Sequence, residues 1–141
     1  MQKRLTTKRI IIHHSASAKD TTVPIITQWH KDRGFATIGY HYVVSGATGE
    51  IHTGRDEILV GAHTKNNNHD SIGICLTGNY EVENVDNAGK EGLLLLLQHL
   101  MDVYGLTWNS VSYHKTWGAT ACPGKNLAII IDEWKTNQKK T

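Results

Sequence analysis

A histidine and a cysteine near the C-terminal end of the chain, His114 and Cys122, carry side chains suited to binding a metal. Imidazole nitrogen and thiolate sulfur are donors that zinc prefers in proteins. The segment between them is too long for one helical turn, and Pro123 and Gly124 directly after the cysteine favour a sharp turn. We therefore expect a loop that folds back on itself. Two ligands cannot hold zinc alone, so the rest of the chain must supply a third.

The third candidate ligand is His13, which ends a β-branched run. Residues 9–13 predict a buried strand that carries His13 and His14 to a site, and residues 110–114 predict a short strand that also ends in a histidine. If the first strand continues, His14 points to its opposite face, so we rank it below His13 as a ligand. His13, His114 and Cys122 are therefore the predicted ligands of one zinc ion per chain.

Three protein ligands are typical of a catalytic zinc site, and four are typical of a structural one. The remaining position takes a water, whose pKa zinc lowers from ~15.7 to about 7. Each of the three residues also has a structural explanation. A histidine at a strand end is commonly hydrogen-bonded, and an isolated cysteine is commonly a small buried apolar side chain. Spacing alone leaves both interpretations open.

The elements that must position these residues follow from hydrophobic periodicity and turn signals. Strands are also expected at 38–44, 50–53 and 71–77, and helices at 21 or 22 to 34, 92–104 and 127–134, whereas 79–90 is expected to be irregular. This order predicts the α/β class (mixed α+β), with a single central mixed sheet flanked by helices. Alternation along the strand at 38–44 places Tyr40 on the same face as Tyr42 and Val44. The candidate ligands fall at strand ends, where open α/β sheets usually carry their sites.

Length and composition describe one domain, residues 1–141. The chain is long enough to form a single self-sufficient core. It has 15 basic and 13 acidic residues and a net charge of +2, which argues against a nucleic-acid partner. Its two cysteines are too few for a disulfide framework, and Cys75 lies in an apolar strand pattern that predicts a buried free thiol. We expect a monomer.

The N-terminal residues are basic and polar, and no apolar run long enough for a signal peptide follows them. The longest aliphatic run, residues 93–97, is far too short to span a bilayer. We therefore expect the chain to be cytoplasmic as synthesised, and to stay in the compartment where it is made unless something else releases it.

Six motifs occur in an order that resembles a known family. They are Ile-His-His-Ser-Ala at 12–16, Gly-Tyr-His-Tyr at 39–42, Gly-Arg-Asp-Glu at 54–57, Val-Gly-Ala-His at 60–63, Asn-His-Asp-Ser-Ile-Gly-Ile at 68–74, and His114 with Ala-Cys-Pro-Gly at 121–124. Together they resemble the zinc-dependent N-acetylmuramoyl-L-alanine amidases, above all the short phage amidase-lysozymes, with the peptidoglycan recognition proteins as more distant relatives. The match runs from about residue 10 to 127, nearly the whole chain.

The resemblance implies a role for several residues. His13, His114 and Cys122 would bind zinc, and the Tyr40 phenol would hydrogen-bond the reacting water or the developing oxyanion. Thr120 stands at the family's other catalytic position, where phage lysozymes carry lysine and catalytic peptidoglycan recognition proteins carry threonine. Positions matching the substrate cleft or a proton shuttle are His63, Asn68 and His41. A second departure is Lys115-Thr116, where relatives often carry Arg-Asp.

The activity implied is hydrolysis of the amide between the lactyl group of N-acetylmuramic acid and L-alanine, with peptidoglycan or a muropeptide as the substrate. Two other functions stay open. A non-catalytic peptidoglycan-binding module of the same fold would tend to lose the cysteine, which this chain keeps. A cytosolic amidase that recycles anhydro-muropeptides would tend to carry aspartate in place of Cys122. The pattern therefore favours a phage or prophage endolysin-like enzyme, which would act on cell-wall peptidoglycan after its release.

Overall fold

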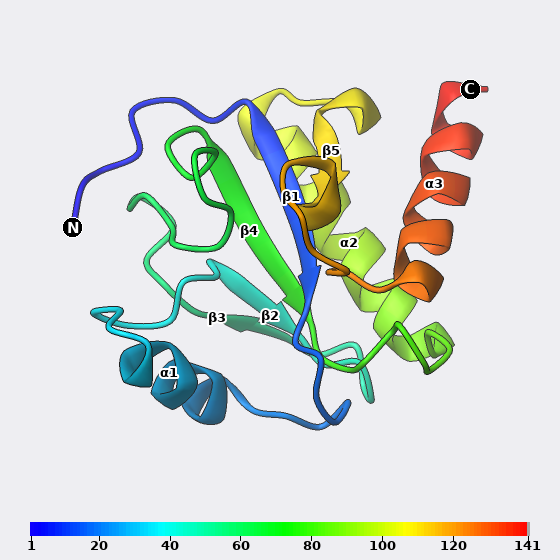
Figure 1. The fold of residues 1–141 in the computed structure, drawn as a ribbon. Helices are drawn as coiled ribbons and strands as arrows, with labels where there is room; N and C mark the ends of the chain where they lie inside the picture. Colours follow the sequence, from blue (N-terminus) through cyan, green and yellow to red (C-terminus); the bar gives the residue numbers. More distant parts are fainter. Residues whose placement is uncertain (141) are drawn as a thin grey trace.

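The computed structural model describes residues 1–140, and its centre is one five-stranded sheet (Figure 1). The strands are β1 (Arg9–His14), β2 (Tyr42–Val44), β3 (Ile51–Thr53), β4 (Ser71–Leu76) and β5 (Val111–Tyr113). Their order in the sheet is β3-β2-β4-β1-β5. The β1–β4, β1–β5 and β2–β4 pairs are parallel, and β2–β3 is antiparallel. The predicted mixed sheet is confirmed.

The two central strands, β1 and β4, are buried almost along their whole length. Their near-continuous aliphatic sequences suit parallel strands that are covered on both faces. In the β1–β4 register Ile12 pairs with Ile74, and His13 pairs with Cys75. Because successive side chains alternate between faces, the two isoleucines point to one side of the sheet, while His13 and Cys75 point to the other.

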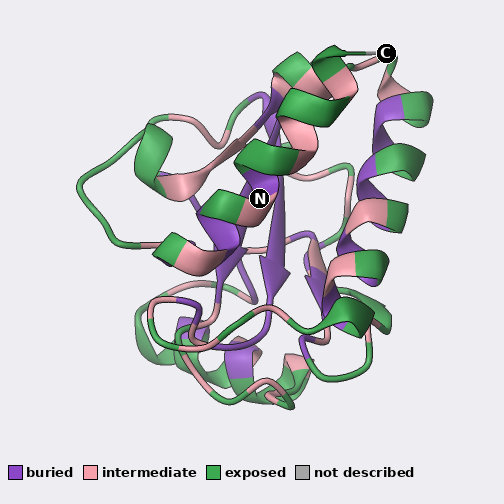
Figure 2. Cartoon of the chain, turned by 90° about the vertical axis from the view of Figure 1, so that its right-hand side faces the viewer, coloured by how far each residue is buried: buried purple, intermediate pink, exposed green. Residues whose placement is uncertain are grey.

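Helices cover both faces of the sheet (Figures 1 and 2). Leucines of α2 (Asn87–Tyr104) and residues of α3 (Lys125–Lys139) pack with Ile12 and Ile74 in the larger core cluster. The smaller cluster on the other face contains Cys75 and Ile26 of α1 (Val23–Asp32). Figure 2 shows buried central strands and helices whose outer sides are exposed. Among the described residues, none of the helices has the length and apolar character needed to cross a bilayer.

Two helices are longer than the sequence predicts. The first turn of α2 lies in a segment expected to be irregular, because its residues are polar and lack the apolar period. Tertiary packing explains this turn. A Cβ on Gly89 would lie 3.0 Å from the carbonyl oxygen of Gly46, and a Cβ on Gly49 would lie 2.1 Å from that of Ala88, so the loop between β2 and β3 packs directly against the turn. Close approach of that loop, rather than an apolar stripe, therefore fixes the start of α2. Helix α3 also runs beyond residue 134 with polar, mostly exposed turns.

The strand predicted at 38–44 is wrong in its first half. Only Tyr42–Val44 is paired as β2, while Gly39 donates its N–H to the His30 ring and accepts a hydrogen bond from the N–H of Ala62. This irregular entry breaks the expected alternation. Tyr40 therefore packs with the smaller cluster, on the side of His13, while Tyr42 packs with the larger one.

Candidate metal centre

Three predicted ligands meet at one point at the carboxyl ends of β1 and β5. His13 is the second-last residue of β1, His114 directly follows β5, and the two strands are parallel neighbours. One ligand atom from each of His13, His114 and Cys122 lies within 4.8 Å of the other two. The Sγ atom of Cys122 is 3.6 Å from Nδ1 of His13. The fold therefore brings two imidazoles and a thiol from opposite ends of the chain into one cluster.

The segment between His114 and Cys122 folds back on itself, as predicted. A short 3-10 turn, η2 (His114–Thr116), opens it, and the N–H of Lys115 donates to the carbonyl of Cys122 over 2.9 Å. Trp117 anchors the loop from outside, because its indole N–H donates to the Ser112 hydroxyl on β5. These bonds hold both ligands of the loop at one edge of the sheet.

His14 takes no part in the cluster. Its Nδ1 accepts the N–H of Tyr80 over 3.1 Å, and Tyr80 belongs to the larger core cluster on the other face of the sheet. The alternation of β1 therefore separates the two adjacent rings, so that only the His13 ring faces Cys122, while His14 contacts the Cys122 thiol through its carbonyl alone, over 3.9 Å.

The ionisation of the cluster suits a metal with nitrogen and sulfur ligands. Burial lowers the pKa of His13 well below its usual value and also lowers that of His114, so both rings keep free lone pairs at neutral pH. Burial raises the pKa of the Cys122 thiol to about 12. A bound cation would offset the cost of the thiolate, as zinc does for its cysteine ligands. The chemistry and convergence of these donors therefore fit a zinc ion.

Tyr40 lies beside the cluster, with its ring centroid 5.0 Å from that of His13. The ring of His30 also lies beside Tyr40, with its centroid 5.1 Å away, and Nδ1 of His30 accepts the N–H of Gly39. Burial raises the pKa of Tyr40 well above its usual value. Its phenol therefore stays neutral and keeps its proton, and the hydroxyl is hydrogen-bonded to the Cys75 thiol.

Thr120 lies on the exposed loop, two residues before Cys122. Its Oγ1 accepts the N–H of Cys122 over 3.2 Å. Since this bond uses a lone pair, the hydroxyl proton of Thr120 stays available to a substrate.

The residues predicted to contact substrate occupy different environments. His63 is 9% exposed, and its Nδ1 is 2.9 Å from Nε2 of His13. The Oδ1 of Asn68 accepts the backbone N–H groups of His63 and Thr64, so this side chain holds the loop at the cleft. His41 is 1% exposed, with Nε2 bonded to the carbonyl of Leu59 and Nδ1 to the N–H of Gly73. Backbone groups thus occupy both nitrogens of His41, which supports the sheet behind the site.

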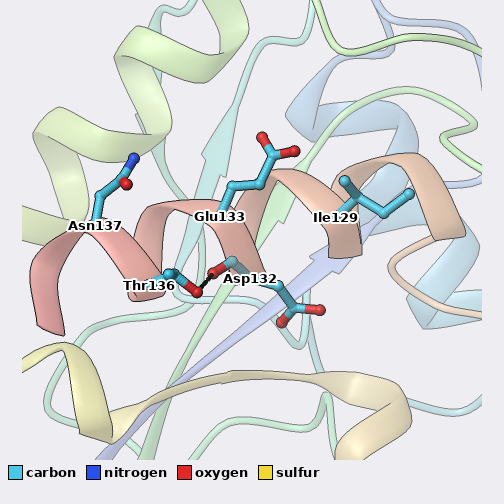
Figure 3. Close-up of a pocket in the computed structure, with 5 residues that line it drawn as sticks. All are labelled: Ile129, Asp132, Glu133, Thr136 and Asn137. Atoms are coloured by element: carbon cyan, nitrogen blue, oxygen red, sulfur yellow. Dashed lines mark hydrogen bonds between the residues drawn. The ribbon is translucent and has the colours of Figure 1, made fainter. Parts of the chain in front are cut away.

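A cavity of about 400 Å³ borders the cluster. It is lined by Arg33, Phe35, Ala62, His63, Thr64, Lys65, Asn68 and His114. A larger surface hollow of about 470 Å³ lies along α3, with side chains that include Asp132 and Glu133 (Figure 3). It contains none of the predicted site residues. The cavity beside His114 is the one that opens next to the candidate ligands.

Comparison with known proteins identifies the family. Residues 3–125 match the family described as N-acetylmuramoyl-L-alanine amidase, and the chain belongs to this family. The endolysin of Enterobacteria phage T3 is 35% identical over 145 residues, covering 98% of this chain and 92% of that protein. Peptidoglycan-recognition protein SC2 of Drosophila melanogaster is 32% identical, covering 88% of this chain and 72% of that protein.

Solved structures agree with this assignment. The endolysine N-acetylmuramoyl-L-alanine amidase LysCS from Clostridium intestinale superposes with a TM-score of 0.87 at 32% identity, covering 96% of this chain and 87% of the other. Peptidoglycan recognition protein SD of Drosophila has a TM-score of 0.86 at 25% identity, covering 95% and 85% of the two chains. The predicted family and fold are confirmed, and the chain is a phage endolysin-like N-acetylmuramoyl-L-alanine amidase.

Proposed function

We propose that His13, His114 and Cys122 bind one zinc ion, and that the chain uses it to cleave the amide between the lactyl group of N-acetylmuramic acid and L-alanine in peptidoglycan. The observation that carries this proposal is the convergence of three ligand atoms within 4.8 Å beside a cavity. Two imidazoles and one thiolate leave one tetrahedral position of the zinc without a protein ligand, which is typical of catalytic zinc.

Zinc bound there would polarise the substrate carbonyl and activate a water for attack on it. The residues of this chain supply the remaining interactions. The neutral phenol of Tyr40, whose ring lies beside that of His13, would donate a hydrogen bond to the oxyanion that develops as the carbonyl is attacked. The hydroxyl of Thr120, on the loop that carries Cys122, would be a second donor, although without the positive charge of a lysine. Such donors stabilise charge that is present only in the transition state.

The cavity beside His114 is the proposed binding site for the stem peptide. Arg33 and Lys65 line it, so it offers positive charge to carboxylates of a peptide substrate. His63 and Asn68 form part of the same wall. We leave His41 out of the contacts to substrate, because backbone groups occupy both of its ring nitrogens.

Release of L-alanine amino termini from purified peptidoglycan tests this proposal. The wild-type chain is expected to release them, to lose the activity to a chelator, and to regain it with zinc. Cys122→Ala is expected to release none while remaining folded. Full activity of Cys122→Ala would remove Cys122 from the mechanism. Binding of peptidoglycan without any release would instead indicate a binding module.

A comparison of intact sacculi with soluble anhydro-muropeptide tests the physiological substrate. We expect sacculi to be cleaved, as the similarity to phage endolysins suggests. Cleavage of the soluble fragment alone would indicate a recycling amidase and contradict the proposal of a wall-degrading enzyme.

A further inference from the structure

A chain of buried hydrogen bonds leads away from the metal cluster through His63. The Nε2 atom of His13 is 2.9 Å from Nδ1 of His63. On the far side of the ring, Nε2 of His63 is 3.2 Å from the hydroxyl of Ser71, the first residue of β4. Ser71 is fully buried, and its hydroxyl donates to the carbonyl of Asn67 over 2.7 Å. The series therefore runs from the candidate ligand to a backbone carbonyl, which has no proton of its own.

The positions of the protons follow from this fixed end. The Asn67 carbonyl can only accept a hydrogen bond, so the Ser71 hydroxyl donates its one proton to that carbonyl. The same hydroxyl must therefore accept a hydrogen bond from Nε2–H of His63. A neutral imidazole has one N–H, which leaves Nδ1 of His63 as an acceptor. The proton between the two histidines consequently belongs to Nε2 of His13. With Nε2 protonated, Nδ1 of neutral His13 carries the lone pair, and this is the atom that faces Cys122.

We propose that His63, oriented by Ser71, is a positioning residue that holds His13 in the tautomer whose Nδ1 is free to bind metal. The inference rests on the proposed zinc site, and it changes the role expected for His63 from contact with substrate to support of a ligand. Hydrogen bonds behind a metal-bound histidine fix its ring and its tautomer, and their loss typically weakens metal binding by about 10- to 100-fold.

The surrounding structure leaves the His63 ring little freedom. A Cβ built on Gly73 of β4 would lie 2.5 Å from the ring, so a side chain at that position would take the space that the imidazole occupies. Asn68 binds the backbone N–H of His63. The Thr64 hydroxyl lies 3.0 Å from Nδ1 of His63 and 3.3 Å from Nε2 of His13, beside the same proton. The His63 ring is thus held by packing against Gly73, by the hydrogen bond from its backbone to Asn68, and by hydrogen bonds at both ring nitrogens.

Zinc affinity, measured by competition with a chromophoric chelator, tests the inference without relying on turnover. His63→Leu keeps apolar bulk but removes the acceptor, and we expect its affinity to fall by about 10- to 100-fold. His63→Asn can place Oδ1 where Nδ1 lies, so it should recover most of the loss. Ser71→Ala removes only the group that fixes the His63 tautomer, and an intermediate loss is expected.

Thr77→Val is the matched control for Ser71→Ala. Thr77 directly follows β4, is fully buried, and its hydroxyl also makes two hydrogen bonds, to Lys19 and Gly46. Both variants lose one buried hydroxyl and should lose comparable thermal stability, but only Ser71→Ala should bind zinc more weakly. Equal zinc affinities in Ser71→Ala and Thr77→Val would overturn the role of Ser71.

Nitrogen NMR of isotopically labelled histidines gives a second readout. In the zinc-loaded wild type we expect protonated Nε2 on both His13 and His63. Protonated Nδ1 on His63, or a His63→Leu variant that binds zinc as tightly as the wild type, would overturn the inference. The proposed function would survive those results, because it requires only that the wild type bind zinc through His13, His114 and Cys122. A wild-type chain that bound no zinc would overturn both.

Discussion

The metal cluster joins two regions of the chain that differ in how they are held. His13 is 1% exposed on a strand that pairs on both sides, and His63 bonds the back of its ring. His114 and Cys122 instead flank residues 115–121, all of which are exposed. The loop is fastened mainly by backbone bonds and by Trp117, whose ring lies 4.5 Å from the Arg9 guanidinium.

This difference separates two tasks that a zinc site requires. The sheet supplies His13, whose ring position and tautomer are already fixed in the metal-free protein. The loop brings two ligands with few buried contacts, and regions of that kind have low local stability. Damage to the sheet side should therefore affect both folding and metal binding, whereas damage to the loop side should affect metal binding alone.

The largest expected effect comes from removing a ligand on either side. Cys122→Ala and His13→Ala should both lose detectable amide hydrolysis, because two donors do not hold a catalytic zinc. Their stabilities should differ. His13→Ala leaves the buried His63 ring without its partner, which costs about 1–3 kcal/mol of unfolding free energy, whereas Cys122→Ala should cost less than ~1 kcal/mol. Chemical denaturation of the metal-free proteins measures both values, and equal losses would contradict the division between sheet and loop.

The next effect concerns the two proposed oxyanion donors, one from each region. Tyr40→Phe keeps the buried ring and removes only the hydroxyl, so kcat should fall by ~10²–10³ with zinc affinity unchanged. Thr120→Val, on the exposed loop, should cost less, since solvent around this exposed position can still donate a hydrogen bond to the oxyanion. Thr120→Ser keeps the donor and serves as the control. A Thr120→Ser variant as slow as Thr120→Val would show that the hydroxyl is not the group that acts.

The outline of both regions could be predicted from the sequence, because it depends on local signals. A β-branched run that ends in His13 and a short alternating segment before His114 indicated strands, and Pro123 after Cys122 indicated the reversal of the chain. Because β1 and β5 are parallel neighbours, their carboxyl ends, and with them His13 and His114, lie at the same edge of the sheet. The family resemblance named the remaining candidates.

What the sequence did not reveal depends on close approaches between distant segments. The first turn of α2 has no apolar period; Ala88 and Gly89 of this turn instead pack closely against the loop at Gly46 and Gly49. Tyr40 does not lie on the predicted face of the sheet, because the N–H of Gly39 donates to the ring of His30 and not to a neighbouring strand. His63 and His13 are fifty residues apart, and no spacing rule predicts their shared proton.

Removal of zinc should distinguish the two regions directly. Zinc that binds only the folded chain stabilises it by about 2.7 kcal/mol at a free concentration one hundred times Kd. The structural consequence should be concentrated in residues 114–122, whose amides are expected to exchange with solvent faster in the metal-free protein. Amides of β1 and β4 should keep their protection relative to global unfolding, because their hydrogen bonds do not depend on the metal. Equal loss of protection in β1 and in the loop would mean that zinc holds the sheet as well.

The smallest expected effect is the response of the buried side to acid. Burial lowers the pKa of His30 to about 4, whereas a histidine in the unfolded chain titrates near 6.5. Between these values the unfolded chain binds a proton that the folded chain excludes. The stability contributed by neutral His30 is therefore complete above about pH 6.5 and is lost as the pH falls toward 4.

His30→Asn isolates this contribution, because Oδ1 can still accept the N–H of Gly39 but does not titrate. In the metal-free protein, where release of zinc by acid plays no part, the unfolding free energy of His30→Asn should fall less steeply between roughly pH 6 and 5, by about one bound proton. A slope equal to that of the wild type would show that His30 titrates alike in both states. Acid would then weaken the protein through other buried groups, such as His41, whose pKa burial also lowers to about 4.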